Sequence, residues 1–178
     1  AFAAFVGGAF RTPYSFGSMI AIATVLGLVA LGSALGFRAG AFNIGTEGQL
    51  ITGGLAAALV AIALPGPGWL VATIALLTAA AVGALWILVP ALLRVFARTN
   101  ELLTTLMMNY VATFVVAFLV INYFRNENTG AVETLPIPED RWLLRILPPS
   151  NANIGILLLV LIALGLWFLF TRTRVGIR

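Results

Sequence analysis

Long, almost uncharged apolar runs repeat along this 178-residue chain, and they constrain its fold more than any other feature. A helix that crosses a membrane needs about 20 mostly apolar residues, because about 30 Å of hydrocarbon is covered at about 1.5 Å per residue. Five segments meet or approach that length: 16–37, 49–64, 69–93, 101–124 and 153–170. We therefore predict an all-α fold, a polytopic transmembrane helical bundle with about five membrane segments.

The composition supports a membrane protein and excludes several classes of function. Apolar residues make up 61% of the chain and charged residues only 9%, whereas a soluble domain carries about a quarter charged residues. The chain contains neither cysteine nor histidine, which excludes a disulfide framework, a thiolate metal site and a histidine-based catalytic triad. No nucleophile–base pair or phosphate-binding loop is present either. We expect no enzymatic activity, no metal and no cofactor in this chain.

The ten basic residues are all arginines and stand singly between apolar runs, so they predict membrane topology and not a nucleic-acid partner. Basic residues favour the cytoplasmic side of a membrane. The alternation over five spans places six of them inside, namely Arg38, Arg94, Arg98, Arg172, Arg174 and Arg178, and four outside, namely Arg11, Arg125, Arg141 and Arg145. The C-terminal end is then cytoplasmic, and residues 125–151 form an extracytoplasmic loop.

Proline and glycine mark the connections between the apolar runs. The stretch from Pro65 to Gly68 reads Pro-Gly-Pro-Gly, which is a strong turn signal. Within the loop at 125–151, residues 142–147 predict a short amphipathic helix on the membrane surface. The chain begins without methionine and ends directly after an apolar run, so we expect a fragment of a longer protein.

The run at 49–64 is short, and polar residues precede it. Sixteen residues make a helix of about 24 Å, less than the hydrocarbon thickness, so this helix should begin below the membrane surface. Four polar residues, Asn43, Thr46, Glu47 and Gln49, would then lie at bilayer depth. Irregular backbone at that depth is tolerated only where it is buried in protein or lines a wet cavity. We therefore predict a broken helix whose N-terminus faces a solute pathway.

Local signals around this break predict how the helix begins. Gly40, Gly45 and Gly48 permit unusual turns. Thr46 as N-cap with Gln49 three residues later fits a capping box, and an acid in the first turn complements the helix dipole. The alternative is a plain cytoplasmic loop between two ordinary helices, in which these residues act only as a cap.

A second polar feature lies on the run at 101–124. Glu101, Thr105, Asn109 and Thr113 recur every four residues and form one stripe on a helix, with Asn100 as its N-cap. A polar stripe on a spanning helix faces the bundle interior or a pathway. Hydrogen bonds between helices, worth about 0.6 kcal/mol each, are the interpretation we favour for the two threonines. For Asn109 and Glu101 we favour a place along the solute pathway.

Four segments, taken together, resemble a known family. Residues 37–50, Phe-Arg-Ala-Gly-Ala-Phe-Asn-Ile-Gly-Thr-Glu-Gly-Gln-Leu, are similar to a signature of ABC-importer permeases of the simple-sugar and nucleoside type. Residues 100–110 resemble a second signature, residues 7–14 resemble an outer segment, and residues 172–178 resemble the approach to the region where the ATPase docks. Ribose-type members carry Gly-Ile-Asp-Leu-Ser where this chain has Phe-Asn-Ile-Gly-Thr-Glu-Gly, which favours the nucleoside branch.

The resemblance implies one partial permease domain over 1–178, without the N-terminal helix and the C-terminal coupling region of the family. It implies a bacterial cytoplasmic membrane location, a second homologous permease subunit, a cytoplasmic subunit that binds ATP and an extracytoplasmic solute-binding lipoprotein. The expected function is ATP-driven import of a nucleoside or simple sugar. A branched-chain amino-acid permease, a gated channel and a membrane scaffold protein are alternatives. The expected pathway residues are Asn43, Thr46, Glu47, Gln49, Glu101 and Asn109.

Overall fold

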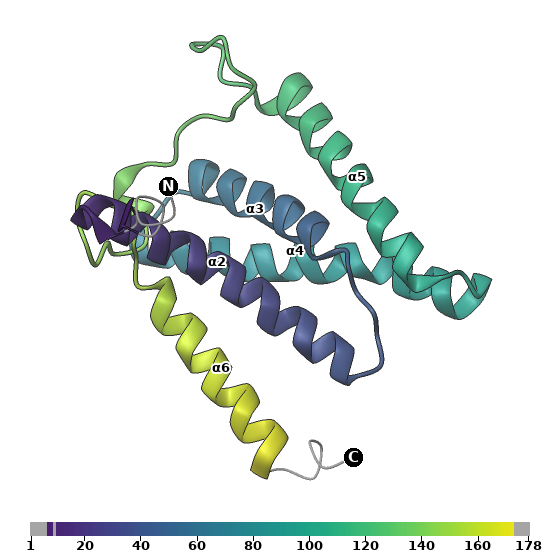
Figure 1. Cartoon of the computed structure of the whole chain (residues 1–178). Coiled ribbons are helices and arrows are strands. Elements are labelled where there is room, and N and C mark those ends of the chain that lie inside the picture. Colours follow the sequence, from purple (N-terminus) through teal and green to yellow (C-terminus); the bar gives the residue numbers. More distant parts are fainter. Residues whose placement is uncertain (1–6, 9, 173–178) are drawn as a thin grey trace. The chain divides into compact units, whose positions relative to one another are not determined.

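The computed structural model describes residues 7, 8 and 10–172 and is helical throughout its apolar parts (Figure 1). Two short helices, the π-helix η1 and the 3₁₀-helix η2, accompany the long ones. In chain order the elements are α2 (Pro13–Arg38), α3 (Thr46–Ala63), α4 (Gly68–Ala97), α5 (Glu101–Leu119), η1 (Val120–Phe124), η2 (Glu139–Arg141) and α6 (Gly155–Arg172). Within the described residues no strand forms, and the all-α prediction is confirmed.

Among the described residues, five helices are long and apolar enough to cross a membrane, as predicted. Each predicted span lies on one of them, with ends that differ by a few residues. The fourth is continuous from Glu101 to Phe124, because η1 extends α5 without interruption. Many of their large apolar side chains are exposed, for example Leu85 at 64% and Phe114 at 73%, which is the surface a lipid environment requires.

The described residues form two compact units. One contains the residues up to Leu31 together with those from Leu143 onward, and the other runs from Gly32 to Trp142. Within the first unit, Gly17 lies so close to Ser150 that an added Cβ would overlap the serine hydroxyl. The second unit contains α3, α4 and α5.

Helices α3 and α4 pack closely because small residues line their contact. A Cβ added to Gly53 would lie 2.8 Å from the carbonyl oxygen of Ala79, and one added to Gly83 would lie 3.4 Å from that of Gln49. In lipid, where water does not drive helices together, such close backbone approach supplies the packing energy. The two helices are joined by the predicted turn at Pro65–Gly68, in which Gly66 has a φ of 146°.

The predicted amphipathic helix at 142–147 is wrong. No helix forms there, and a 3₁₀ turn at Glu139–Arg141 precedes an extended stretch. The backbone N–H of Ile146 donates to the Ala152 carbonyl, and the N–H of Ile154 donates to that of Leu144. This pairing and the two prolines at 148 and 149, which disfavour helical backbone at the preceding residue, explain the difference.

Candidate functional site

Helix α3 begins after an irregular stretch at residues 39–45, as the broken-helix prediction requires. This stretch and the first turn of α3 are called the break below. Gly40 has a φ of 74°, a conformation in which glycine carries no steric cost. Further along, the Asn43 side chain accepts a hydrogen bond from the Gly45 N–H at 2.7 Å. The stretch is therefore ordered by its own side chains where it enters α3.

The predicted capping box is wrong. The N-cap of α3 is Gly45, with no side-chain cap from its own residue, and Thr46 is the first residue of the helix. The Gln49 side chain does not reach back to the N-cap. It accepts a hydrogen bond from Asn43 Nδ2 at 2.8 Å and donates from Nε2 to the Gly83 carbonyl at 3.1 Å. Gln49 thereby joins the irregular stretch to α4.

The first turn of α3 is capped from another helix. Asn109 of α5 accepts a hydrogen bond from the Gly48 N–H at 2.8 Å and donates from Nδ2 to the Ile44 carbonyl at 3.1 Å. Thr105, one turn earlier on α5, accepts from the Ile44 N–H at 3.3 Å. Both side chains are buried, at 8% and 1% exposure. Two residues of the polar stripe on α5, Thr105 and Asn109, therefore form one hydrogen-bonded assembly with the break.

Glycine is required at this junction for close approach, not for unusual dihedral angles. A Cβ on Gly45 would lie 3.0 Å from the Thr105 carbonyl oxygen. One on Gly48 would lie 3.0 Å from Nε1 of Trp86 and 3.1 Å from Oδ1 of Asn109. Three helices thus meet at Gly48. Sequence reasoning missed Trp86 on α4, because a tryptophan in an apolar run gives no signal beyond packing.

The neighbouring helices extend well past the break. Gly83 and Trp86, which lie beside the first turn of α3, are well inside the 30-residue α4. At about 1.5 Å per residue, Gly83 is about 22 Å from either end of α4, and Trp86 is about 17 Å from its C-terminal end. Figure 1 shows α4 continuing beyond the end at which α3 begins. Asn109 lies about two turns after the start of α5 at Glu101. The break is therefore surrounded by helix and does not lie at the end of the three-helix core.

The predicted site residues are in part brought together. Asn43, Gln49 and Asn109 bond directly to the break, and Thr46 and Glu47 form its first helical turn. Glu47 is exposed, and its carboxylate has no hydrogen-bond or ion-pair partner among the described residues. The N–H groups of Thr46 and Glu47 also have none there. The buried Nε1 of Trp86, beside Gly48, likewise has no hydrogen-bond partner among the described residues.

Glu101 lies apart from this cluster. Its carboxylate pairs with Arg94 at 2.5 Å and is 17% exposed, whereas the arginine side chain is 48% exposed. The pair joins the end of α4 to the start of α5, where Asn100 caps the helix through the N–H groups of Leu102 and Leu103, as predicted. Glu101 therefore already has a partner on the neighbouring helix.

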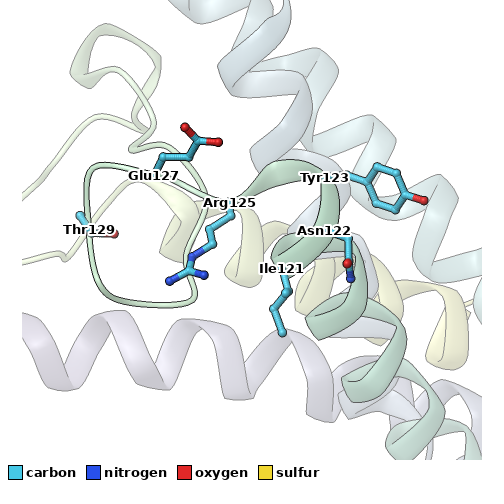
Figure 2. Close-up of a pocket in the computed structure, with 6 residues that line it drawn as sticks. All are labelled: Ile121, Asn122, Tyr123, Arg125, Glu127 and Thr129. Carbon is cyan, nitrogen blue, oxygen red and sulfur yellow. The ribbon is translucent and has the colours of Figure 1, made fainter.

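A separate, open pocket of about 500 Å³ lies where η1 ends (Figure 2). The side chain of Tyr123 points away from the others in this view, and Arg125 and Glu127 point in different directions. Its lining residues are Ile121, Asn122, Tyr123, Arg125, Glu127 and Thr129. Because their polar groups do not converge, the break is the better candidate site. In the described part of the chain no group of three or more acidic residues is arranged to hold a metal ion.

Comparisons with known proteins give a consistent result. A family model described as the branched-chain amino acid transport system permease component matches residues 15–178. The guanosine ABC transporter permease protein NupP of Bacillus subtilis is 34% identical over 171 residues, which is 95% of this chain and 49% of that protein. No solved structure matches the chain.

Two further relatives are permeases named for other solutes. The nucleoside ABC transporter permease protein NupB of Lactococcus lactis is 26% identical over 84% of this chain and 43% of its own length. The glucose ABC transporter permease protein TsgB13 of Haloferax volcanii is 29% identical over 84% of this chain and 42% of its own length. The chain thus spans about half the length of these relatives.

Proposed function

Because this chain belongs to the family of branched-chain amino acid transport system permease components, we propose that the full-length protein is the permease subunit of an ATP-driven ABC importer for nucleosides. Two of the three relatives named above are permeases for guanosine or nucleosides, and one of them has the highest identity of the three. The third is a glucose permease, so a simple sugar is the second candidate solute.

The observation that carries this proposal is the polar break inside the three-helix core. In a spanning bundle, α4 and α5 cross the hydrocarbon. The break lies about 17–21 Å before the C-terminal end of α4 and about two turns after the start of α5. That register supports a position inside the hydrocarbon slab, nearer to the side where α5 begins. Holding a carboxylate at the centre of a spanning helix costs roughly 2.5–3.5 kcal/mol on insertion scales. Glu47 therefore indicates a water-filled path beside it.

The free groups at the break suit a neutral solute rich in hydroxyl and N–H groups. The Glu47 carboxylate accepts hydrogen bonds, whereas the N–H groups of Thr46 and Glu47 donate them. A nucleoside offers ribose hydroxyls and base N–H groups to the carboxylate, and base carbonyl or nitrogen acceptors to the helix end. A free sugar offers only the hydroxyl part of this pattern.

In this proposal the site residues divide into two roles. Thr46 and Glu47 contact the solute, while Asn43, Gln49 and Asn109 hold the backbone of the break in place. Glu101 forms the inner rim of the pathway, where its ion pair with Arg94 holds α4 against α5. The Glu101–Arg94 ion pair and the hydrogen bonds that hold the break keep the solute-binding groups of Thr46 and Glu47 at a fixed spacing during transport.

The rest of the transport system is proposed from the family. A second, homologous permease completes the pathway, a cytoplasmic subunit binds and hydrolyses ATP, and an extracytoplasmic lipoprotein delivers the solute. This chain itself binds no cofactor, lies in the bacterial cytoplasmic membrane and has its C-terminal end in the cytoplasm. ATP at the partner drives the change between outward and inward states because it binds one of them more tightly.

Uptake by Glu47 variants tests the proposal. Cells that express the full-length protein with its partner subunits receive radiolabelled guanosine, glucose or leucine. We expect guanosine uptake in the wild type, and its loss in Glu47→Ala and Glu47→Gln with unchanged membrane levels. Glu127→Gln, which removes an exposed acid at the distant pocket, serves as the matched control and should import normally.

Two outcomes would contradict this account. Normal uptake by Glu47→Ala would show that the residue only complements the helix dipole. Uptake of glucose or leucine in place of guanosine by the wild type would assign the protein to another substrate class of the same family.

A further inference from the structure

The polar segment from Arg125 to Arg141, which follows η1, contacts the C-terminal end of α3. Arg141, the last residue of η2, donates hydrogen bonds from Nη1 to the carbonyls of Ala61 and Ile62, at 2.5 and 3.2 Å. Its side chain is only 16% exposed, whereas that of its acidic neighbour Asp140, 3.9 Å from Nε, is 64% exposed. The guanidinium is therefore bound mainly to the end of α3.

The end of α3 needs such a donor. The last carbonyls of a helix have no partner within it, and α3 has no basic residue in its last turn. In apolar surroundings each unpaired carbonyl is costly, and a cation there also complements the negative end of the helix dipole. Arg141 supplies both the hydrogen bonds and the charge from a segment about 80 residues away in sequence.

A second contact holds the same segment in place. Gly68, the first residue of α4, lies so close to Asp140 that an added Cβ would overlap its carbonyl oxygen. The segment is thus locked onto the turn between α3 and α4 by a backbone approach and by the Arg141 side chain. Movement of this segment is then transmitted to the end of α3.

We propose that Arg141 is a positioning residue for the break at the opposite end of α3. The 18 residues from Thr46 to Ala63 form one uninterrupted helix, so a displacement of its last turn also changes the orientation of its first turn. Asn109 holds the first turn and Arg141 holds the last. Release of Arg141 lets α3 tilt about its capped N-terminal turn, which changes how Thr46 and Glu47 are presented. The consequence for transport rests on the proposed function.

A cysteine at the break reports this tilt without transport. Thr46→Cys is introduced into the full-length protein with any other cysteine replaced, and its rate of alkylation by a water-soluble maleimide is measured in membranes. Arg141→Gln should raise that rate several-fold at a normal protein level. Arg141→Lys, which keeps the charge but lacks the planar fork of donors, should give an intermediate rate. Arg125→Gln removes the same charge from the same segment and should leave the rate unchanged.

An unchanged rate in Arg141→Gln, or an equal increase in Arg125→Gln, would overturn the proposal. If Arg141→Gln fails to accumulate, the comparison between Arg141→Lys and wild type decides, and equal rates overturn it. The labelling rate is measured without solute. A wild-type protein that imports no nucleoside would therefore refute the proposed function, whereas a raised labelling rate in Arg141→Gln would still support the role of Arg141. Normal uptake with unchanged labelling in Arg141→Gln would refute the role of Arg141 alone.

Discussion

Asn109 on α5 caps the first turn of α3 through Gly48, with 2.8 Å between Oδ1 and the Gly48 nitrogen. The same amide donates to the Ile44 carbonyl, so one buried side chain satisfies a donor and an acceptor of the irregular backbone. Backbone groups without partners are not tolerated in hydrocarbon. This contact therefore makes a broken helix possible at this position, and it joins the two polar features of the sequence.

Removal of the Asn109 side-chain amide should destabilise the protein more than the loss of an average hydrogen bond between membrane helices. An average hydrogen bond between membrane helices is worth about 0.6 kcal/mol. Asn109→Ala, however, leaves the buried Gly48 N–H without a partner, which costs about 1–3 kcal/mol, and also frees the part-buried Ile44 carbonyl, which water can reach more easily. We expect a loss of about 1–3 kcal/mol in the free energy of unfolding, measured in detergent.

The matched control is Asn122→Ala. Asn122 is exposed and donates only to the Phe118 carbonyl of its own helix, so its loss should change stability by less than about 0.5 kcal/mol. Equal effects of the two substitutions would contradict the capping role of Asn109.

Two adjacent glycines on α3 should respond in opposite ways to alanine. A Cβ on Gly53 meets the Ala79 carbonyl at 2.8 Å, whereas one on Gly54 meets nothing within 4 Å. Gly53→Ala forces α3 and α4 apart and should destabilise by about 1–3 kcal/mol. Gly54→Ala removes backbone freedom from the unfolded chain and should stabilise by about 0.5–1 kcal/mol. Thermal unfolding of the two variants checks the order, and a reversed order would refute the close packing of these helices.

The predicted topology can be tested by labelling from one side of the membrane. A cysteine at Asn128, in the segment placed outside, should react with an impermeant thiol reagent applied to intact cells. A cysteine at Arg98, at the end of α4, should react only after the membrane is opened. Opposite labelling of the two positions would invert the orientation that we derive from the arginines.

The spans were predictable because a long apolar run has few solutions in lipid other than a helix. An irregular stretch before α3 was predictable for a related reason, since the run at 49–64 is short and Asn43, Thr46 and Glu47 precede it. The depth of that stretch in the membrane stays a prediction. The N-cap Asn100 was also correct, because its partners are its own near neighbours.

The failures have a common physical cause. The first turn of α3 is capped by Asn109, 61 residues away from Gly48, and the last by Arg141, 80 residues away from Ala61. Local spacing carries no information about such partners and predicts Thr46 as the N-cap, whereas the N-cap is Gly45. The helical tendency predicted for 142–147 is likewise overridden by backbone pairing with residues 152–154.

The most direct test of the central claim measures where the break lies relative to water and lipid. A spin label is attached at Glu47→Cys in the full-length protein in bilayers, and its collisions with a water-soluble nickel chelate are compared with those at two reference positions. Arg98→Cys reports bulk water at the end of α4, and Leu85→Cys reports lipid beside the break. We predict a collision rate at position 47 between the two references, as expected for a wet path inside the bilayer. A rate equal to that at position 98 would place the break in open solvent, and a rate equal to that at position 85 would exclude water from it; either result would contradict the account.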